Sequence, residues 1–165
     1  MTDPSWIAKA RGYVGLREIN GATHNPKILE WWRAIGASWF KDDETPWCGA
    51  FVGGVLAEAG ITPPAKGAGA SARAWLEFGV RLSRPAYGCL VVFERAGGGH
   101  VGFVVGKDKA GNLMVLGGNQ GDAVNIKPFA AERALGYRWP SVYPMEERFN
   151  LPVLASDGRL SQNEA

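Results

Sequence analysis

The chain has 165 residues, of which 46% are hydrophobic and 21% charged, and its formal net charge is +2. This length and apolar content suit one compact domain that buries its own core. The nearly balanced charge, with no basic run interleaved with aromatic residues, argues against a nucleic-acid partner. It permits contact with an anionic polymer without requiring it.

The order of residues argues against two further classes of protein, those with a secretory signal peptide and those with a membrane-spanning helix. The N-terminus begins Met1-Thr2-Asp3-Pro4 and has no basic leader before an apolar run, so we expect synthesis in the cytoplasm without a signal peptide. No stretch approaches the roughly 18 apolar residues that a membrane helix needs. We therefore expect no membrane insertion, and we expect a monomer.

The cysteine count gives little support to a cross-linked or metal-bound protein. Two cysteines do not make a disulfide framework. A zinc site is conceivable on count alone, but the spacing of its four candidates fits no closed site. Those candidates are His24, Cys48, Cys89 and His100. We expect no metal.

Helix-start signals recur in the first half of the chain. A capping side chain precedes proline at Asp3-Pro4, Asn25-Pro26 and Thr45-Pro46, and proline is favoured at the first helical position. A glycine suited to a helix end follows each apolar stripe. These signals predict helices over residues 4–14, 26–35 and 46–59, and a short helix over 72–78.

After Pro85 the hydrophobic period changes to that of strands. Buried strands are predicted over residues 89–93, 100–106 and 113–116, and residues 124–127 and 135–139 complete an antiparallel sheet. Helices followed by strands indicate an α+β fold. We expect a catalytic domain over residues 1–147 and a C-terminal tail over 148–165 that is loose from Ser156 onward.

Cys48 is the first candidate for chemistry. With Thr45 as N-cap, Cys48 becomes the third helical residue, at the positive end of the helix dipole and among unpaired N–H groups. This environment favours the thiolate and offers donors for an oxyanion. The alternative is a small buried hydrophobe, as most free cysteines are, so the interpretation depends on a partner base.

The predicted hairpin between residues 100–106 and 113–116 supplies that base. Residues 108–111 suit a four-residue loop, and pairing of Lys107 with Asn112 sets the register. In this register His100 lies opposite Asn119, whose amide could orient the imidazole. Taken alone, a structural histidine and a turn asparagine are the simpler interpretations.

The same register places Gly102 opposite Gly117 on the face that carries His100. Two opposed glycines leave a groove, so we expect the Cys48 helix to approach the sheet there. Cysteine on a helix, histidine on a strand and a polar residue on the next strand form the scaffold of papain-like enzymes.

Three segments resemble the motifs of CHAP-type and NlpC-type cysteine amidases and peptidases. Residues 43–52, DETPWCGAFV, resemble the nucleophile motif, and residues 99–103, GHVGF, resemble the histidine motif. Residues 116–120, LGGNQ, resemble the third motif of a branch common among phage lysins. The resemblance spans roughly Trp6 to Pro140.

The resemblance implies a papain-like hydrolase of amide bonds in bacterial peptidoglycan. Cys48 would be the nucleophile, His100 the base and Asn119 the orienting residue, with no cofactor in the catalytic step. Members act as N-acetylmuramoyl-L-alanine amidases or as endopeptidases of the stem peptide. Some bind calcium, but acidic residues 42–44 are equally explained by the helix dipole.

Four further residues are singled out by their positions. Cys89 stands where many relatives carry aspartate, and because it heads an apolar run we expect a core cysteine. Asp42 occupies the position of an oxyanion-stabilising glutamine in papain-like enzymes, so the safer donor is the Cys48 backbone N–H. Trp47 and Gln120 flank catalytic positions and could bind substrate, although burial of Trp47 under the helix is an equal alternative.

The resemblance, together with the small single domain that has no signal peptide, predicts an endolysin-like enzyme. We expect it to reach the cell wall after release, by a holin or a non-classical route. An interbacterial toxin with the same chemistry is the first alternative. A non-catalytic wall-binding module and a hydrolase of amides outside the wall are the others.

Overall fold

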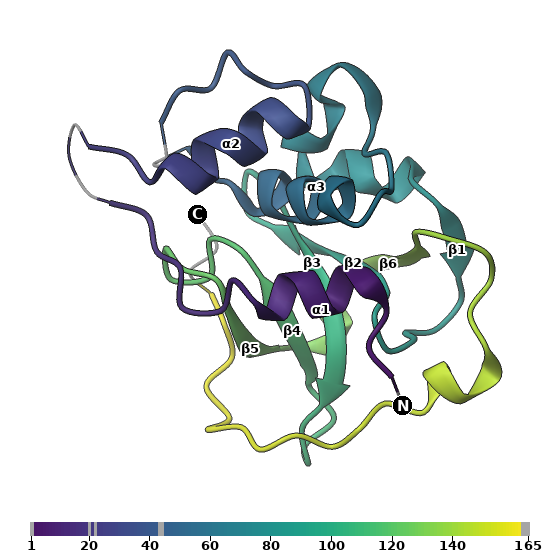
Figure 1. The fold of residues 1–165 in the computed structure, drawn as a ribbon. Helices are drawn as coiled ribbons and strands as arrows, with labels where there is room; N and C mark the ends of the chain where they lie inside the picture. Colours follow the sequence, from purple (N-terminus) through teal and green to yellow (C-terminus); the bar gives the residue numbers. More distant parts are fainter. Residues whose placement is uncertain (1, 20, 22, 43–44, 163–165) are drawn as a thin grey trace.

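The computed structural model describes residues 2–19, 21, 23–42 and 45–162. It confirms the predicted α+β architecture, in which helices pack on an antiparallel sheet (Figure 1). The α-helices are α1 (Ser5–Arg11), α2 (Pro26–Ala34) and α3 (Cys48–Glu58). The short 3₁₀ helices are η1 (Ala65–Ala70), η2 (Ala72–Glu77), η3 (Ala131–Arg133) and η4 (Glu146–Phe149).

Helix α2 begins where the sequence predicts. The Asn25 side chain accepts a hydrogen bond from the Lys27 N–H at 2.9 Å, and Pro26 is the first helical residue. Proline fits this position because its missing N–H would have no helical partner there. Gly36, just beyond the helix, has a φ of 76°, the left-handed conformation that ends helices.

Helix α3 begins later than predicted. Its N-cap is Trp47 rather than Thr45, because the backbone N–H and hydroxyl of Thr45 are hydrogen-bonded to the Asp42 carboxylate. These bonds hold Thr45 in the preceding loop. Cys48 is therefore the first residue of the helix, not the third.

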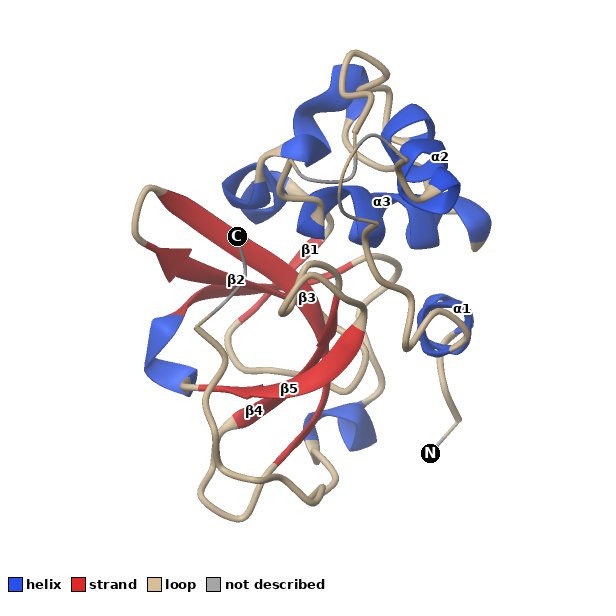
Figure 2. Cartoon of the chain, turned by 90° about the vertical axis from the view of Figure 1, so that its left-hand side faces the viewer, coloured by secondary structure: helices blue, strands red, loops and turns tan. Residues whose placement is uncertain are grey.

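Among the described residues, the sheet contains six strands in the order β1-β6-β2-β3-β4-β5, and every neighbouring pair is antiparallel. Figure 2 shows the helices above and beside this sheet. Five strands confirm the prediction, and the short β1 was not predicted. The strands are β1 (Val80–Leu82), β2 (Leu90–Arg95), β3 (Gly98–Lys107), β4 (Leu113–Gly117), β5 (Asn125–Phe129) and β6 (Ala134–Trp139).

The loop between β3 and β4 corrects the predicted register. Lys107 pairs with Leu113 and not with Asn112. The reason is Asp108, whose Oδ1 accepts hydrogen bonds from the N–H groups of Ala110 and Asn112 at 3.0 and 2.9 Å. The aspartate thereby retains Asn112 in the loop.

A bulge between Val104 and Gly106 restores the predicted register farther along the hairpin, where Phe103 pairs with Leu116. The β3–β4 ladder ends at that pair. The predicted register made His100 and Asn119 partners in this ladder. They are not partners, because the ladder ends before it reaches them.

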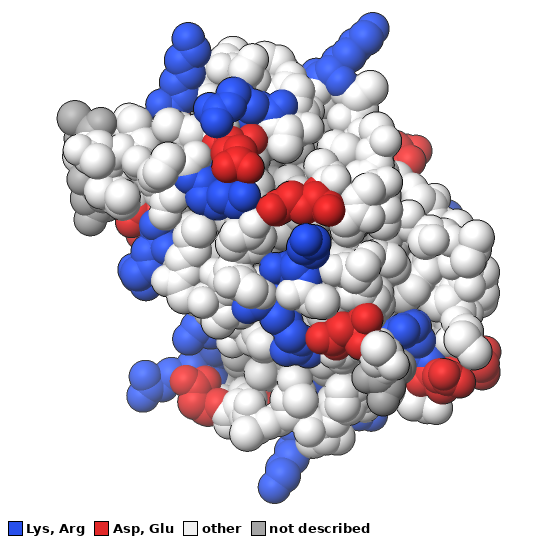
Figure 3. Space-filling model, in the orientation of Figure 1, with Lys and Arg blue, Asp and Glu red and all other residues white. Residues whose placement is uncertain are grey.

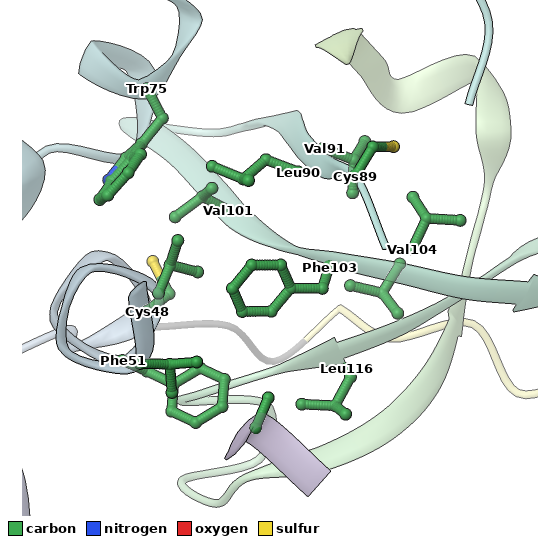
Figure 4. Packing of buried hydrophobic residues seen from close by; sticks show 14 of the residues in the cluster. Cys48, Phe51, Trp75, Cys89, Leu90, Val91, Val101, Phe103, Val104 and Leu116 are labelled. Atoms are coloured by element: carbon green, nitrogen blue, oxygen red, sulfur yellow. The ribbon is translucent and has the colours of Figure 1, made fainter. Parts of the chain in front are cut away.

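Helix α3 packs on the face of the sheet that carries Val101 and Phe103 (Figure 4). The Phe51 ring of α3 meets the Phe103 ring edge-on, with centroids 6.3 Å apart. This corrects the prediction that the helix approaches the glycine groove. A Cβ atom on Gly102 would lie 2.6 Å from Val115 Cγ1, so this glycine makes room for a strand neighbour rather than for the helix.

The chain beyond residue 147 contacts the sheet. Lys107 and Leu154 are joined by a backbone hydrogen bond of 2.7 Å, and the Ser161 N–H donates to the Pro128 carbonyl at 2.8 Å. The predicted boundary at residue 147 stays a prediction. Residues 163–165 of the predicted tail lie outside the described residues.

The surface matches the nearly balanced charge of the chain. On the face shown in Figure 3, lysine and arginine side chains are interspersed with aspartate and glutamate, without a broad patch of either sign. Among the described helices, none has the length and apolar content needed to span a membrane.

Candidate active site

Cys48 lies at the N-terminal end of α3, where backbone N–H groups have no partner inside the helix. The first intrahelical bond is donated by Phe51 to the Trp47 carbonyl at 2.9 Å. The N–H groups of Cys48 and Gly49 lie close enough to the thiol to act on its pKa. These are the donors that can meet an oxyanion formed at the sulfur.

The Cys48 thiol lies against the edge of β3. The Val104 N–H donates to Cys89 at 2.8 Å, toward β2, so the alternation of a strand directs the Val101 N–H to the opposite edge. Because the β3–β4 ladder ends at Phe103, that edge is open to α3. The Val101 N–H lies close enough to the Cys48 sulfur to act on the pKa of the thiol, which places the thiol beside the His100–Val101 peptide.

Burial raises the pKa of Cys48 above its ordinary value of 9.0. The N–H groups of Val101, Gly49 and Cys48 itself and the positive charge of Arg95 act in the opposite direction without outweighing burial. The side chain is only 4% exposed. The net direction is opposite to the predicted stabilisation of the thiolate, so a base has to remove the proton.

His100 is fully buried on the other face of β3. Alternation along the strand turns its side chain away from that of Val101. Its ring is nearly parallel to Phe129, at 5.2 Å and 5°, and is stacked on Phe93 at 6.5 Å. The imidazole and the thiol thus both belong to the His100–Val101 stretch of β3, the imidazole as a side chain of the strand and the thiol beside its backbone.

Gln120 holds one nitrogen of the imidazole. His100 Nε2 lies 3.0 Å from Gln120 Oε1. The Gln120 amide nitrogen faces the carbonyl oxygens of Val115 and Asn125 and the Asn125 side-chain oxygen, at 3.2, 3.0 and 2.9 Å. Three acceptors around the nitrogen fix the orientation of the amide, so Nε2 is the donor and Nδ1 the acceptor of neutral His100.

Gly117 makes this contact possible. A Cβ atom at Gly117 would lie 2.2 Å from Gln120 Oε1 and 3.3 Å from His100 Nε2. The first distance is well inside van der Waals contact, so any larger residue displaces the glutamine. The second glycine of the predicted groove therefore makes room for a side chain of the following turn rather than for the helix.

Asn119 lies in the turn that follows β4 and is 1% exposed. Its φ is 59°, a left-handed conformation that asparagine tolerates better than most residues. This turn allows the next side chain, Gln120, to fold back against β4. Gln120 accepts the hydrogen bond of His100 Nε2, and the orienting role of Asn119 stays a prediction.

Trp47 is fully buried. Its Nε1 donates to Glu18 Oε1 at 3.2 Å, and its ring is stacked on Trp31 with centroids 6.2 Å apart. This geometry agrees with the alternative of burial under the helix. Gln120 is also buried, at 1% exposed, and a substrate-binding role for either residue stays a prediction.

A segment near the N-terminus lies beside the Asn119–Gln120 turn. Residues 15–18 are joined to residues 122–124 by backbone hydrogen bonds of 2.8–3.1 Å. Trp47 contacts the same segment through Glu18. The segment therefore lies next to both the cap of α3 and the turn that carries the partner of His100.

The remaining candidates in the described part of the chain have structural roles. Asp42 binds Thr45 and is an acceptor in the loop before α3. Cys89 is a core cysteine, as predicted, and burial raises its pKa to about 12. In the described part of the chain, no group of three histidine, cysteine or acidic side chains could hold a metal. Asp43 and Glu44 lie outside that part.

Residues 40–119 match the family model of the CHAP domain. The matched segment contains Cys48, His100 and Asn119 and ends one residue before Gln120. The match is consistent with the CHAP/NlpC-type superfamily that the sequence motifs resemble. CHAP domains are typically cysteine-dependent amidases or peptidases, so the match supports peptidoglycan hydrolysis in a broad sense. None of the curated proteins compared with the chain matches it.

Proposed function

We propose that this protein is an endolysin-like peptidoglycan hydrolase that cleaves an amide bond through Cys48 and His100. The observation that carries the proposal is the position of the Cys48 thiol. It lies at the start of α3 and beside the His100–Val101 peptide, within the segment that matches the CHAP domain. A buried thiol with a raised pKa next to a histidine-bearing strand suits a base-assisted nucleophile.

The first half of the reaction forms a thioester. His100 removes the Cys48 proton through Nδ1, because Nε2 is the donor to Gln120. The sulfur attacks the amide carbonyl carbon, and the N–H groups of Cys48 and Gly49 stabilise the oxyanion. Protonated His100 then donates its proton to the leaving amine, and the carbon–nitrogen bond breaks.

The second half regenerates the enzyme. A water molecule gives a proton to His100 and attacks the thioester carbon. Collapse of the second tetrahedral intermediate releases the carboxylic acid product, and the thiolate recovers the proton. Asn119 was predicted to orient His100. The Gln120 hydrogen bond supports an orienting contact from the adjacent residue.

We further propose that the enzyme acts as a monomer on the cell wall after release from the cell in which it is made. The bond cut is either the amide between the glycan and the stem peptide or one within the stem. Cleavage of either amide bond would proceed through attack by the Cys48 sulfur and a thioester intermediate.

The test compares the wild type, Cys48→Ala and Cys89→Ala on isolated peptidoglycan, with mass spectrometry of the released products. Cys89→Ala is the matched control, because it removes the other buried thiol. We expect release by the wild type and by Cys89→Ala, and none by Cys48→Ala. Product masses identify the bond that is cut.

Two results contradict the proposal. Equal release by wild type and Cys48→Ala would show that Cys48 is not the nucleophile. No release from several wall types by the wild type would favour a wall-binding module or a substrate outside the wall.

A further inference from the structure

We propose that a pocket at the tip of the β2–β3 hairpin binds a free carboxylate of the substrate's peptide. This inference rests on the proposed function and names a binding site for it. The pocket has a volume of about 790 Å³, which suits a short peptide. Its charged lining residues are Arg73, Glu94, Arg95 and Arg133, and residues 160–162 close one side.

The charge of the pocket favours an anion. Among the described lining residues, three are arginines and one, Glu94, carries a carboxylate. Within the described chain, neither Arg73 nor Arg95 forms an ion pair. Arginine presents a planar fork of donors that matches a carboxylate.

Two of the arginines are fixed in place by backbone carbonyl groups. Arg73 Nε donates to Gly98 at 2.9 Å. Arg133 donates to the Glu94 carbonyl through Nε and Nη2, at 3.3 and 3.0 Å, and to the Ser161 carbonyl through Nη1. These bonds orient both side chains at the wall of the pocket before a ligand arrives, which lowers the entropy lost on binding.

Arg95 is the part of the pocket most clearly suited to a ligand. Its Nε atom is buried and has no hydrogen-bond partner among the described residues. A buried donor without a partner is unfavourable by itself. An incoming carboxylate would supply the missing acceptor together with an opposite charge.

The pocket is also close to the catalytic residues. The Arg133 guanidinium lies 5.7 Å from the ring centroids of both Phe93 and Phe129, and both rings stack on His100. The charge of Arg95 reaches the Cys48 thiol. Figure 2 shows the β2–β3 hairpin projecting at the margin of the sheet. A peptide anchored here can therefore extend toward the His100–Val101 stretch of β3.

The test uses the Cys48→Ala protein, which binds peptide without cutting it, and isothermal titration calorimetry. The probes are one stem peptide with free carboxylates and the same peptide with those groups converted to amides. We expect the acid form to bind about tenfold more tightly, and Arg95→Gln to abolish that difference. Arg33→Gln removes an exposed arginine of α2 and should leave the difference unchanged.

Equal affinity for the two peptides, or a preference that survives in Arg95→Gln, would overturn the inference. Circular dichroism confirms that each variant is folded. The proposed function is scored separately, by wall hydrolysis with the wild type. Hydrolysis without a carboxylate preference refutes this pocket alone, whereas carboxylate binding without hydrolysis refutes the enzyme alone.

Discussion

Gln120 Oε1 lies 3.0 Å from His100 Nε2, and the nitrogen of the same amide is surrounded by acceptors from Val115 and Asn125. The glutamine therefore accepts from the imidazole and cannot reverse its amide without losing three favourable contacts. This contact determines the tautomer of a buried histidine.

Replacing Gln120 with leucine should lower activity by about 10- to 100-fold, because the Nε2–H loses its acceptor in a buried site. Gln120→Glu keeps an acceptor and should retain more activity. The chain has only two histidines, so nitrogen NMR of a His24→Gln background reports His100 alone. We expect the Nε2–H tautomer in the wild type and a mixture in Gln120→Leu.

Asn119→Gly separates the side chain of Asn119 from its backbone conformation. Glycine accepts a φ of 59° without strain, so activity should persist if Asn119 mainly shapes the turn. A loss as large as that of Gln120→Leu would instead assign the orienting role to the Asn119 amide.

Gly117→Ala should disturb the same contact from the other side. The added Cβ would lie 2.2 Å from Gln120 Oε1, so the glutamine has to move away from His100. We expect a loss of activity like that of Gln120→Leu, with a destabilisation of about 1–3 kcal/mol from overpacking. In the double variant Gly117→Ala/Gln120→Ala, the losses of activity should not add. Additive losses would contradict a shared cause.

The two thiols should differ in their reaction with iodoacetamide. Burial raises the pKa of both, to about 12 for Cys89, and Cys89 is also fully buried. Cys48 should react first, at a rate that rises about tenfold per pH unit at neutral pH, because only the thiolate reacts. Peptide mapping after quenching measures both rates. A rate independent of pH near neutrality would reveal a Cys48 thiolate paired with protonated His100.

Cys89 should also make the protein less stable in alkali. Its pKa is about 12 in the fold and near 9.0 when exposed, so the folded state retains a proton that the unfolded state releases. The associated stability is present below pH 9 and is lost as pH rises from 9 toward 12. Denaturant titrations of wild type and Cys89→Ala at pH 8 and pH 10.5 should show a smaller decline in the variant. An equal loss of stability in both proteins would show that groups other than Cys89 cause the decline.

Asp42 should matter for the loop before α3 rather than for the oxyanion. Asp42→Ala removes the acceptor of two hydrogen bonds from Thr45 and should lower the free energy of unfolding by about 1–2 kcal/mol. Asp42→Asn keeps an acceptor and should retain both stability and most of the activity. Full stability of Asp42→Ala together with lost hydrolysis would indicate a catalytic role.

Much of the fold was predictable because hydrophobic period and capping residues are local signals. Asn25-Pro26 and the apolar run after Cys89 each specify their element within a few residues. The strand Val80–Leu82 is three residues long, too short to show a period. The start of α3 depends on Asp42, whose carboxylate competes for Thr45, and a capping pattern alone does not reveal such competition.

The elements that carry the candidate residues were predictable, but the contacts of those residues were not. The glycines at 102 and 117 correctly marked a place of close approach. The groups that approach these glycines, the side chains of Val115 and Gln120, were not predicted. Their positions depend on a bulge at Val104–Gly106 and on the left-handed turn at Asn119. Gln120 stood in the third motif, yet its fold back onto His100 follows from that turn rather than from sequence spacing.

The pairing of residues 15–18 with 122–124 has a consequence for turnover. With Cys48 4% exposed and His100 fully buried, a wall polymer reaches them only in molecules in which the site has opened. The observed rate is then the intrinsic rate multiplied by the fraction of such molecules. Three backbone hydrogen bonds hold this pairing beside Trp47 and Gln120, so substitutions that weaken them should change the fraction of molecules in which the site admits a substrate.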